Sequence, residues 1–118
     1  MLVPFCQLPD NARVWIYPSS RKFTPNELLA IRQKTEAFLE QWTAHGTQLQ
    51  AGLDLPYDHF IVLGLNESIQ SASGCSIDAS VHFIQSLEET FKITLLDKMN
   101  VTFRNKNSID HISLKEFR

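Results

Sequence analysis

The chain has 118 residues, of which 43% are hydrophobic and 20% are charged, and its net charge is −2. This length suits one domain, and the composition is that of a folded chain rather than a disordered one. The small negative charge excludes an overall positive field that would attract nucleic acid. No apolar run reaches the roughly 20 residues that cross a bilayer. Neither nucleic acid nor a membrane is therefore an expected partner.

The cysteine content and the first residues indicate the compartment. Two cysteines, Cys6 and Cys75, are too few for a disulfide framework. The start of the chain, residues 1–5, lacks the basic and apolar regions of a signal peptide. Thiols outside disulfides, in a chain without an export signal, are typical of a reducing compartment. We therefore expect a cytoplasmic protein of bacterial type.

The N-terminal part of the chain predicts an arm followed by a strand. Residues 1–12 contain two prolines and an Asp-Asn pair, which are typical of irregular structure, so we expect an N-terminal arm. Residues 13–17 are mostly β-branched or aromatic, and Pro18 ends this run. The pattern predicts a strand over residues 13–17.

A strong helix start follows at Thr24. Its hydroxyl group can accept a hydrogen bond from the backbone N–H of Glu27, whose carboxylate can bind the N–H of Thr24 in return. Pro25 stands at the first helical position, where its missing N–H costs nothing. Apolar residues then recur at helical spacing until Gly46, which suits a left-handed helix end. The sequence predicts a helix over residues 24–45.

The second half of the chain predicts two strands, a helix and a last strand. Residues 49–55 alternate between apolar and polar, which indicates a half-exposed strand, whereas residues 60–65 are continuously apolar and indicate a strand covered on both faces. A helical period predicts a helix over residues 76–92, and residues 101–103 suggest a short strand. Residues 106–118 are interpreted as a C-terminal extension, with a turn and then the first turn of a helix.

The order of these elements predicts the fold class. The order β-α-β-β-α-β is that of a ferredoxin-like α+β sandwich, an antiparallel sheet with both helices on one face. We expect one such domain over residues 1–105, with the strands at 13–17 and 59–65 as neighbours in the centre of the sheet. The alternative is another small α+β arrangement that has the same elements in a different strand order.

A sheet covered by helices on one side leaves its other face open. Alternation along the first strand suggests that Arg13, Trp15 and Tyr17 lie on this open face. Such aromatic groups are typical of protein interfaces or of surfaces under a tail, whereas two aromatics on an acidic domain are thin support for nucleic-acid stacking. The interpretation ranked first is a non-catalytic binding or assembly module, with a homodimer or another protein as partner.

The polar run from Asn66 to Ser80 supplies the candidate site. In the predicted topology, the end of the first helix and the start of the second lie at the same end of the molecule. The residues expected there are Trp42, His45, Gly46, Glu67, Ser73, Gly74, Cys75, Ser76 and Asp78.

This cluster has several chemical interpretations. A thiolate at Cys75 would be favoured by the helix N-terminus, with His45 as base and a carboxylate to orient it. We therefore expect Cys75 to be the more reactive of the two cysteines. The backbone N–H groups could instead hold a small anion. The plainer interpretation is a buried Cys75, a serine that caps the helix and His45 at a helix end. The sequence leaves open whether the protein is an enzyme.

Metal and cofactor sites are not predicted. Cys75, His45, His59 and His82 lack the spacing of known ligand sets. No G-x-x-x-x-G-K-[ST] motif occurs, so no P-loop nucleotide site is expected.

Several short motifs carry a resemblance to a known family. They are Val3-Pro4-Phe5, Gln7-Leu8-Pro9, Arg13-Val14-Trp15-Ile16-Tyr17, Trp42-Thr43-Ala44-His45-Gly46, Ser73-Gly74-Cys75-Ser76-Ile77-Asp78, Ser80-Val81-His82-Phe83 and Met99-Asn100-Val101. In these motifs, which cover most of the chain, it resembles a small bacterial family whose members are often labelled "ABC transporter ATPase". That label implies a P-loop, which this chain does not have. The resemblance implies no catalytic residue, and it implies that other members continue beyond the region of residues 114–117.

Overall fold

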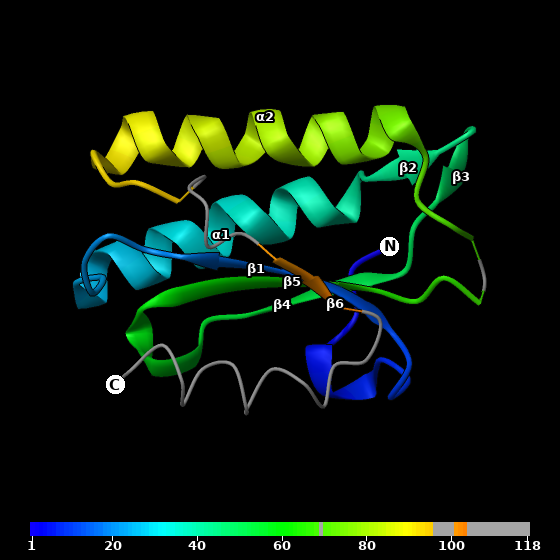
Figure 1. The fold of residues 1–118 in the computed structure, drawn as a ribbon, viewed down its shortest axis with the longest axis horizontal. Coiled ribbons are helices and arrows are strands. Elements are labelled where there is room, and N and C mark those ends of the chain that lie inside the picture. Colours follow the sequence, from blue (N-terminus) through cyan, green and yellow to red (C-terminus); the bar gives the residue numbers. More distant parts are fainter. Residues whose placement is uncertain (69, 96–100, 104–118) are drawn as a thin grey trace.

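The computed structural model describes residues 1–68, 70–95 and 101–103, so the predicted C-terminal extension lies outside the described residues. The protein is an α+β chain with two helices and an antiparallel sheet (Figure 1), as predicted. In chain order the elements are η1 (Phe5–Gln7), β1 (Arg13–Pro18), α1 (Pro25–Glu40), β2 (Thr43–Ala44), β3 (Thr47–Gln48), β4 (Ala51–Asp54), η2 (Pro56–Asp58), β5 (Phe60–Leu65), α2 (Gly74–Phe91) and β6 (Val101–Phe103).

The sheet is organised around β1 and β5. Its strand order is β4-β5-β1-β6, and every neighbouring pair is antiparallel. The register of the central pair runs from Arg13 opposite Leu65 to Pro18 opposite Phe60, so the expected neighbouring of these two strands is confirmed. Among the described helices, none combines the length and apolar character needed to cross a membrane.

Helix α1 begins with the N-cap residue, Thr24, that the sequence predicts. The backbone N–H of Glu27 donates to Thr24 Oγ1 over 3.2 Å, and the N–H of Thr24 donates to Glu27 Oε1 over 2.9 Å. These two bonds satisfy N–H groups that the first helical turn would otherwise leave without partners. The predicted capping box is therefore confirmed.

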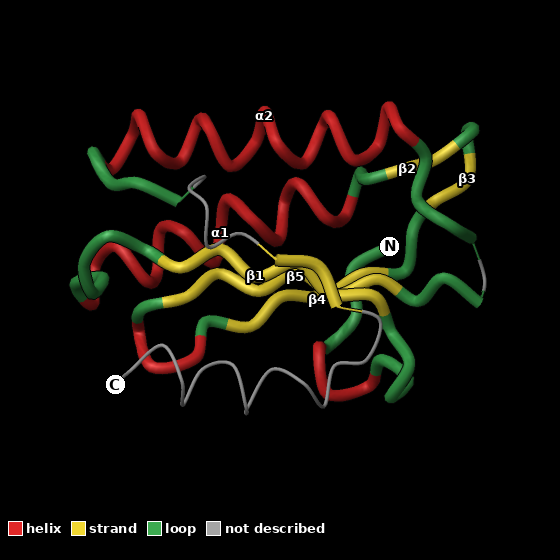
Figure 2. Tube along the Cα trace, viewed as in Figure 1, coloured by secondary structure: helices red, strands yellow, loops and turns green. Residues whose placement is uncertain are grey.

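The end of α1 differs from the prediction. The helix ends at Glu40, and the chain then forms the β2–β3 hairpin, which Figure 2 shows apart from the main sheet and near the start of α2. The two residues of its turn, His45 and Gly46, have φ angles of 53° and 78°. Positive φ at both positions is the requirement of a type I′ hairpin turn. Gly46 is thus a hairpin glycine rather than a helix end.

The start of α2 lies two residues before the predicted one. Ser73 is the N-cap, and its Oγ accepts the backbone N–H of Ser76 over 3.1 Å. The Ser76 hydroxyl oxygen accepts the N–H of Ser73 over 2.8 Å, so serine here takes the place of the usual glutamate in a capping box. This pairing brings Gly74 and Cys75 into the first helical turn.

The helices pack on the sheet face that carries Trp15 and Tyr17. Figure 1 shows α1 and α2 on the same side of the sheet, and both aromatic side chains belong to the buried cluster that includes Ile31 of α1 and Ile84 of α2. Trp15 is 7% exposed and Tyr17 is 3% exposed. The expectation of an open face at these residues is therefore wrong, because the large aromatics fill the space between sheet and helices.

The opposite face of the sheet has its own small buried cluster. Val14, Ile16, Phe60 and Val62 are buried there, and Phe5 of the N-terminal arm packs against them. Period-two alternation sends neighbouring residues of a strand to opposite faces, so the sequence pattern itself was right and its assignment to the two faces was inverted.

The N-terminal arm also covers β4. A Cβ atom added at Gly52 would lie 2.6 Å from the carbonyl oxygen of Val3 and 3.1 Å from the Cα atom of Phe5. Glycine is therefore needed where the arm crosses the strand. Ala51, Gly52 and Leu53 are all buried, which corrects the prediction of a half-exposed second strand.

A charged clamp joins the start of α1 to the end of α2. The guanidinium group of Arg21 donates to both carboxylate oxygens of Glu27 over 2.7 Å and to the carbonyl oxygen of Phe91 over 3.1 Å. The hydrogen bonds from Arg21, and then that from the Thr24 backbone, lower the pKa of Glu27 from 4.5 to about 2. Solvent screening keeps the stabilisation modest, because the Arg21 side chain is 44% exposed.

We predict a specific pH dependence from this clamp. A carboxyl group whose pKa is lowered by folding stabilises the folded state above its unfolded pKa and loses this effect as pH falls through the folded pKa. Urea unfolding should show that Glu27→Gln lowers the free energy of unfolding at pH 7, and that the difference from wild type shrinks between pH 4.5 and about 2. A difference that stays constant across this range would contradict the assignment. Glu89→Gln, which lies outside the clamp, is the matched control.

Candidate functional site

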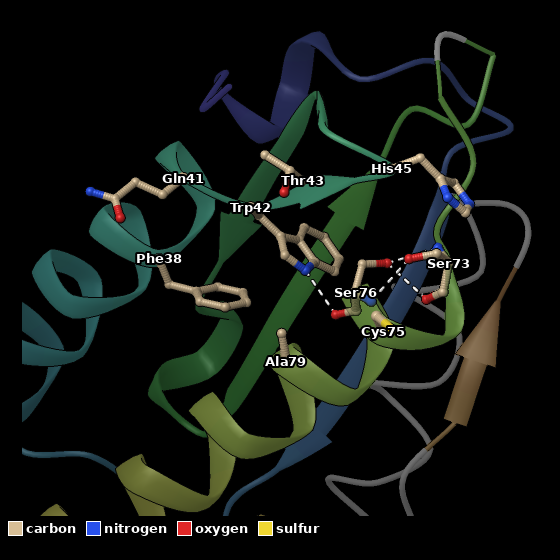
Figure 3. A pocket seen from close by; sticks show the side chains of 9 residues that line it. All are labelled: Phe38, Gln41, Trp42, Thr43, His45, Ser73, Cys75, Ser76 and Ala79. Carbon is tan, nitrogen blue, oxygen red and sulfur yellow. Dashed lines mark hydrogen bonds between the residues drawn. The ribbon is translucent and has the colours of Figure 1, made fainter.

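A cavity of about 450 Å³ lies where α1 ends and α2 begins. Figure 3 shows the side chains that line it, which come from the end of α1 and the two residues after it, the β2–β3 hairpin, and the N-cap and first two turns of α2. They are Phe38, Gln41, Trp42, Thr43, His45, Ser73, Cys75, Ser76 and Ala79. The structure thus brings His45 together with Ser73, Cys75 and Ser76, which are about 30 positions away in the chain.

Trp42 forms the inner wall of this cavity. Its indole Nε1–H donates a buried hydrogen bond of 2.8 Å to the carbonyl oxygen of Ser76. Its ring packs against Phe38 with centroids 5.6 Å apart and edge-on against Trp15 at 5.9 Å. Phe38 in turn stacks on Phe83 at 4.6 Å. Because the indole N–H is already engaged, Trp42 offers a ring surface to a ligand rather than a hydrogen-bond donor.

The first turn of α2 forms the polar side of the cavity. The hydroxyl groups of Ser73 and Ser76 are engaged in the capping box, and Ser76 Oγ also donates to the carbonyl oxygen of Ser73 over 2.8 Å. Within the described residues, the backbone N–H groups of Gly74 and Cys75 have no acceptor. These two groups lie at the positive end of the α2 dipole and can donate to a ligand.

Cys75 is exposed, which rules out the interpretation that it is a buried packing residue. Cys6 is also exposed, and no disulfide joins the two. Cys75 occupies the second position of α2, as expected for a thiol at a helix N-terminus. The site therefore presents one accessible sulfur on its wall.

His45 reaches the cavity from the turn of the β2–β3 hairpin. No hydrogen bond between His45 and Cys75 is present in the described part of the chain, and no carboxylate there binds the imidazole. Nucleophilic catalysis by a thiol normally needs a base within hydrogen-bond reach and a third group that orients this base. The structure places both side chains in one cavity without forming that arrangement.

The two carboxylates expected beside His45 lie elsewhere. Glu67 accepts the backbone N–H of Ala72 over 3.2 Å and lies 3.5 Å from the guanidinium group of Arg13. It therefore holds the segment that leads into α2. Asp78 is exposed on α2 and does not line the cavity.

Of the residues expected on an open face, Arg13 and Trp15 lie next to the cavity wall. The guanidinium group of Arg13 lies over the ring of Trp15 at 4.8 Å from its centroid, a cation–π contact next to the wall of the cavity. Burial raises the pKa of Tyr17, and a hydrogen bond with Ser80 acts in the opposite direction. Tyr17 is therefore a neutral core residue rather than part of a binding surface.

Four lining residues were not predicted: Phe38, Gln41, Thr43 and Ala79. For Ala79 a signal was present, since it lies four positions after Cys75 and so on the same face of a helix. No group of three or more metal-ligating side chains gathers among the residues that the structure describes.

Comparison of the chain with models of protein families, with curated proteins and with solved structures finds no match. The chemistry of the cavity itself therefore carries the inference about function.

We predict that Trp42→Phe lowers the free energy of unfolding by about 1–2 kcal/mol more than Trp15→Phe does. Both changes remove the same ring volume, but only the first removes the hydrogen bond to Ser76, and a buried hydrogen bond is worth about that much. Denaturant unfolding of the two variants measures the difference. Equal losses would show that the bond to Ser76 adds nothing to stability.

Proposed function

We propose that the protein is a non-catalytic binding module that holds a small ligand in the cavity between α1, the β2–β3 hairpin and α2. The observation that carries this proposal is the convergence of an aromatic wall and several polar groups on one cavity of about 450 Å³. Ligand sites are typically concave, span about 300–1,000 Å³ and combine apolar walls with a few placed polar groups. The binding surface is thus the cavity rather than the sheet face that the sequence suggested.

The lining of the cavity indicates the chemistry of the ligand. Phe38 and Trp42 present ring surfaces, which favour a flat apolar group. His45 and the backbone N–H group of Cys75 lie on the polar side and favour a group that accepts hydrogen bonds. A small aromatic compound that carries a carboxylate or a similar acceptor combines the two features.

The proposed fold class is the ferredoxin-like sandwich. The strand order β4-β5-β1-β6, the antiparallel pairing and the packing of α1 and α2 on one buried cluster support it. The β2–β3 hairpin is then an insertion between the first helix and the second long strand. This insertion builds one side of the cavity, so the proposed function depends on a departure from the plain β-α-β-β-α-β pattern.

The remaining expectations become part of the proposal. Two cysteines without a disulfide support a reducing compartment, and we place the protein in the cytoplasm on that ground.

The motifs named above support membership of the bacterial family often labelled "ABC transporter ATPase", without a nucleotide site. A homodimer or another protein partner would need a surface other than Trp15 and Tyr17, because both are buried.

A second candidate function is thiol chemistry or anion binding at Cys75. The exposed sulfur of Cys75 and the imidazole of His45 share one cavity, and within the described residues the backbone N–H of Cys75 has no acceptor. This combination favours the candidate. Binding is ranked first because it needs no hydrogen bond between the thiol and a base, and none is present among the described residues.

We predict that Ala79→Trp abolishes ligand binding. Ala79 is exposed and lines the cavity, so an indole at this position fills the space without disturbing the core. The probes are indole-3-acetate and tryptamine, which share a ring and differ in charge, followed by ¹⁵N chemical-shift titration. The wild-type protein should show saturable shifts at Phe38, Trp42 and His45, larger for the acetate.

The matched control is Ala37→Trp, which adds the same side chain to an exposed position of α1 outside the cavity. This variant should retain the wild-type shifts. The proposal is contradicted if neither probe shifts the cavity residues at millimolar concentration, or if Ala79→Trp leaves the shifts unchanged.

We predict that Cys75 reacts severalfold faster with iodoacetamide at neutral pH than Cys6 does. Its sulfur is exposed at the positive end of α2, where a developing negative charge is stabilised, whereas Cys6 lies in the three-residue helix η1. Cys6→Ser and Cys75→Ser variants isolate the two rates. A slower reaction at Cys75 would remove the thiol candidate and leave the binding proposal intact.

A further inference from the structure

The outer edge of β4 is already used by the chain as a site of strand addition. Leu2 forms a parallel β-bridge with Ala51, in which the N–H of Ala51 donates to the carbonyl oxygen of Met1 over 3.1 Å. The N–H of Val3 donates to the carbonyl oxygen of Ala51 over 2.9 Å. The N-terminal arm thus occupies the first part of this edge.

The arm leaves the edge before it reaches Leu53. Backbone groups of successive strand residues point in opposite directions, so Leu53 shares the outward direction of Ala51 while Gly52 faces β5. After Val3 the chain passes beneath Gly52, where the Cα atom of Phe5 lies 3.1 Å from an added Cβ position. In the part of the chain that the structure describes, the outward N–H and carbonyl groups of Leu53 have no partner.

Two cavities lie beside this stretch of edge. One of about 390 Å³ is lined by Val3 and Leu53, and the other, of about 320 Å³, by Leu29 and Leu55. Arg32 of α1 borders both cavities. Leu29, which lines the second cavity, is 60% exposed.

One cavity is lined by Leu53 of β4 and the other by Leu55, which directly follows this strand. Two residues of extended chain span roughly 6.6 Å. Alternate side chains of a strand placed on the edge are separated by the same distance. The charges on the rim are mixed. Arg32 lies 4.0 Å from Glu36, and Asp58 lines the second cavity. These charges favour neither an acidic nor a basic peptide.

We propose that this edge binds an extended peptide of a partner protein as an added strand. Its main chain bonds to the N–H and carbonyl groups of Leu53, and two apolar side chains at alternate positions enter the two cavities. Strand addition of this kind takes affinity from main-chain hydrogen bonds and specificity from pockets for alternate side chains. The arm shows that the same edge accepts a strand, and it ends where the cavities begin.

The test uses the peptide acetyl-Thr-Val-Thr-Leu-Thr-amide at up to about 1 mM, the concentration scale of weak association. We expect saturable ¹⁵N shifts at Arg32, Leu53 and Leu55, and at least tenfold slower hydrogen exchange of the Leu53 amide. A peptide N-methylated on both apolar residues should not bind, because these residues face β4. N-methylation of the central threonine, which faces away, should preserve binding.

Two variants on α1 localise the effect. Leu29→Glu should weaken binding at least tenfold, and Ala37→Glu, which places the same carboxylate outside both cavities, should not. Ala79→Trp should also leave peptide binding unchanged. A negative result with the peptide therefore contradicts only the strand-addition proposal and not the proposed ligand site. Absence of shifts with the unmodified peptide overturns the proposal, and so does binding that survives N-methylation of both apolar residues. Protection of the Leu53 amide in a dimer without peptide overturns it in favour of a second copy.

Discussion

The hydrogen bond from the Trp42 indole to the Ser76 carbonyl oxygen ties the end of α1 to the start of α2. It forms in a buried position, where a polar group without a partner would be costly. Three other features depend on this contact: the direction in which the chain leaves α1, the position of the β2–β3 hairpin and the aromatic wall of the cavity. The candidate site is therefore a consequence of how two helix ends are joined.

The parts of the fold that depend on neighbouring residues could be predicted from the sequence. The capping box of Thr24 and Glu27 spans three positions, and its bonds form as the spacing indicates. The end of α1 could not be predicted in the same way, because a glycine suits a helix end and a hairpin turn equally well. The pairing of β2 with β3 places Gly46 in a hairpin turn rather than at a helix end.

The faces of the sheet depend on contacts that lie far apart in the sequence. Alternation along β1 separates Trp15 from Ile16, but it does not say which of the two meets the helices. The arm decides this, since it covers the face of Ile16 and leaves the larger space to Trp15. For the site, topology alone was enough to bring His45 near Cys75, whereas their exact orientation follows from a two-residue turn that the sequence pattern did not reveal.

The central claim is that Trp42 is fixed by its bond to Ser76 and so forms a rigid wall of the cavity. Hydrogen exchange of the Trp42 indole proton, followed by ¹⁵N NMR, tests this claim most directly. A proton held in a buried hydrogen bond exchanges only when the structure opens. The account predicts protection similar to that of the amides in the central strands β1 and β5. Exchange at the rate of an indole in free solution would contradict it.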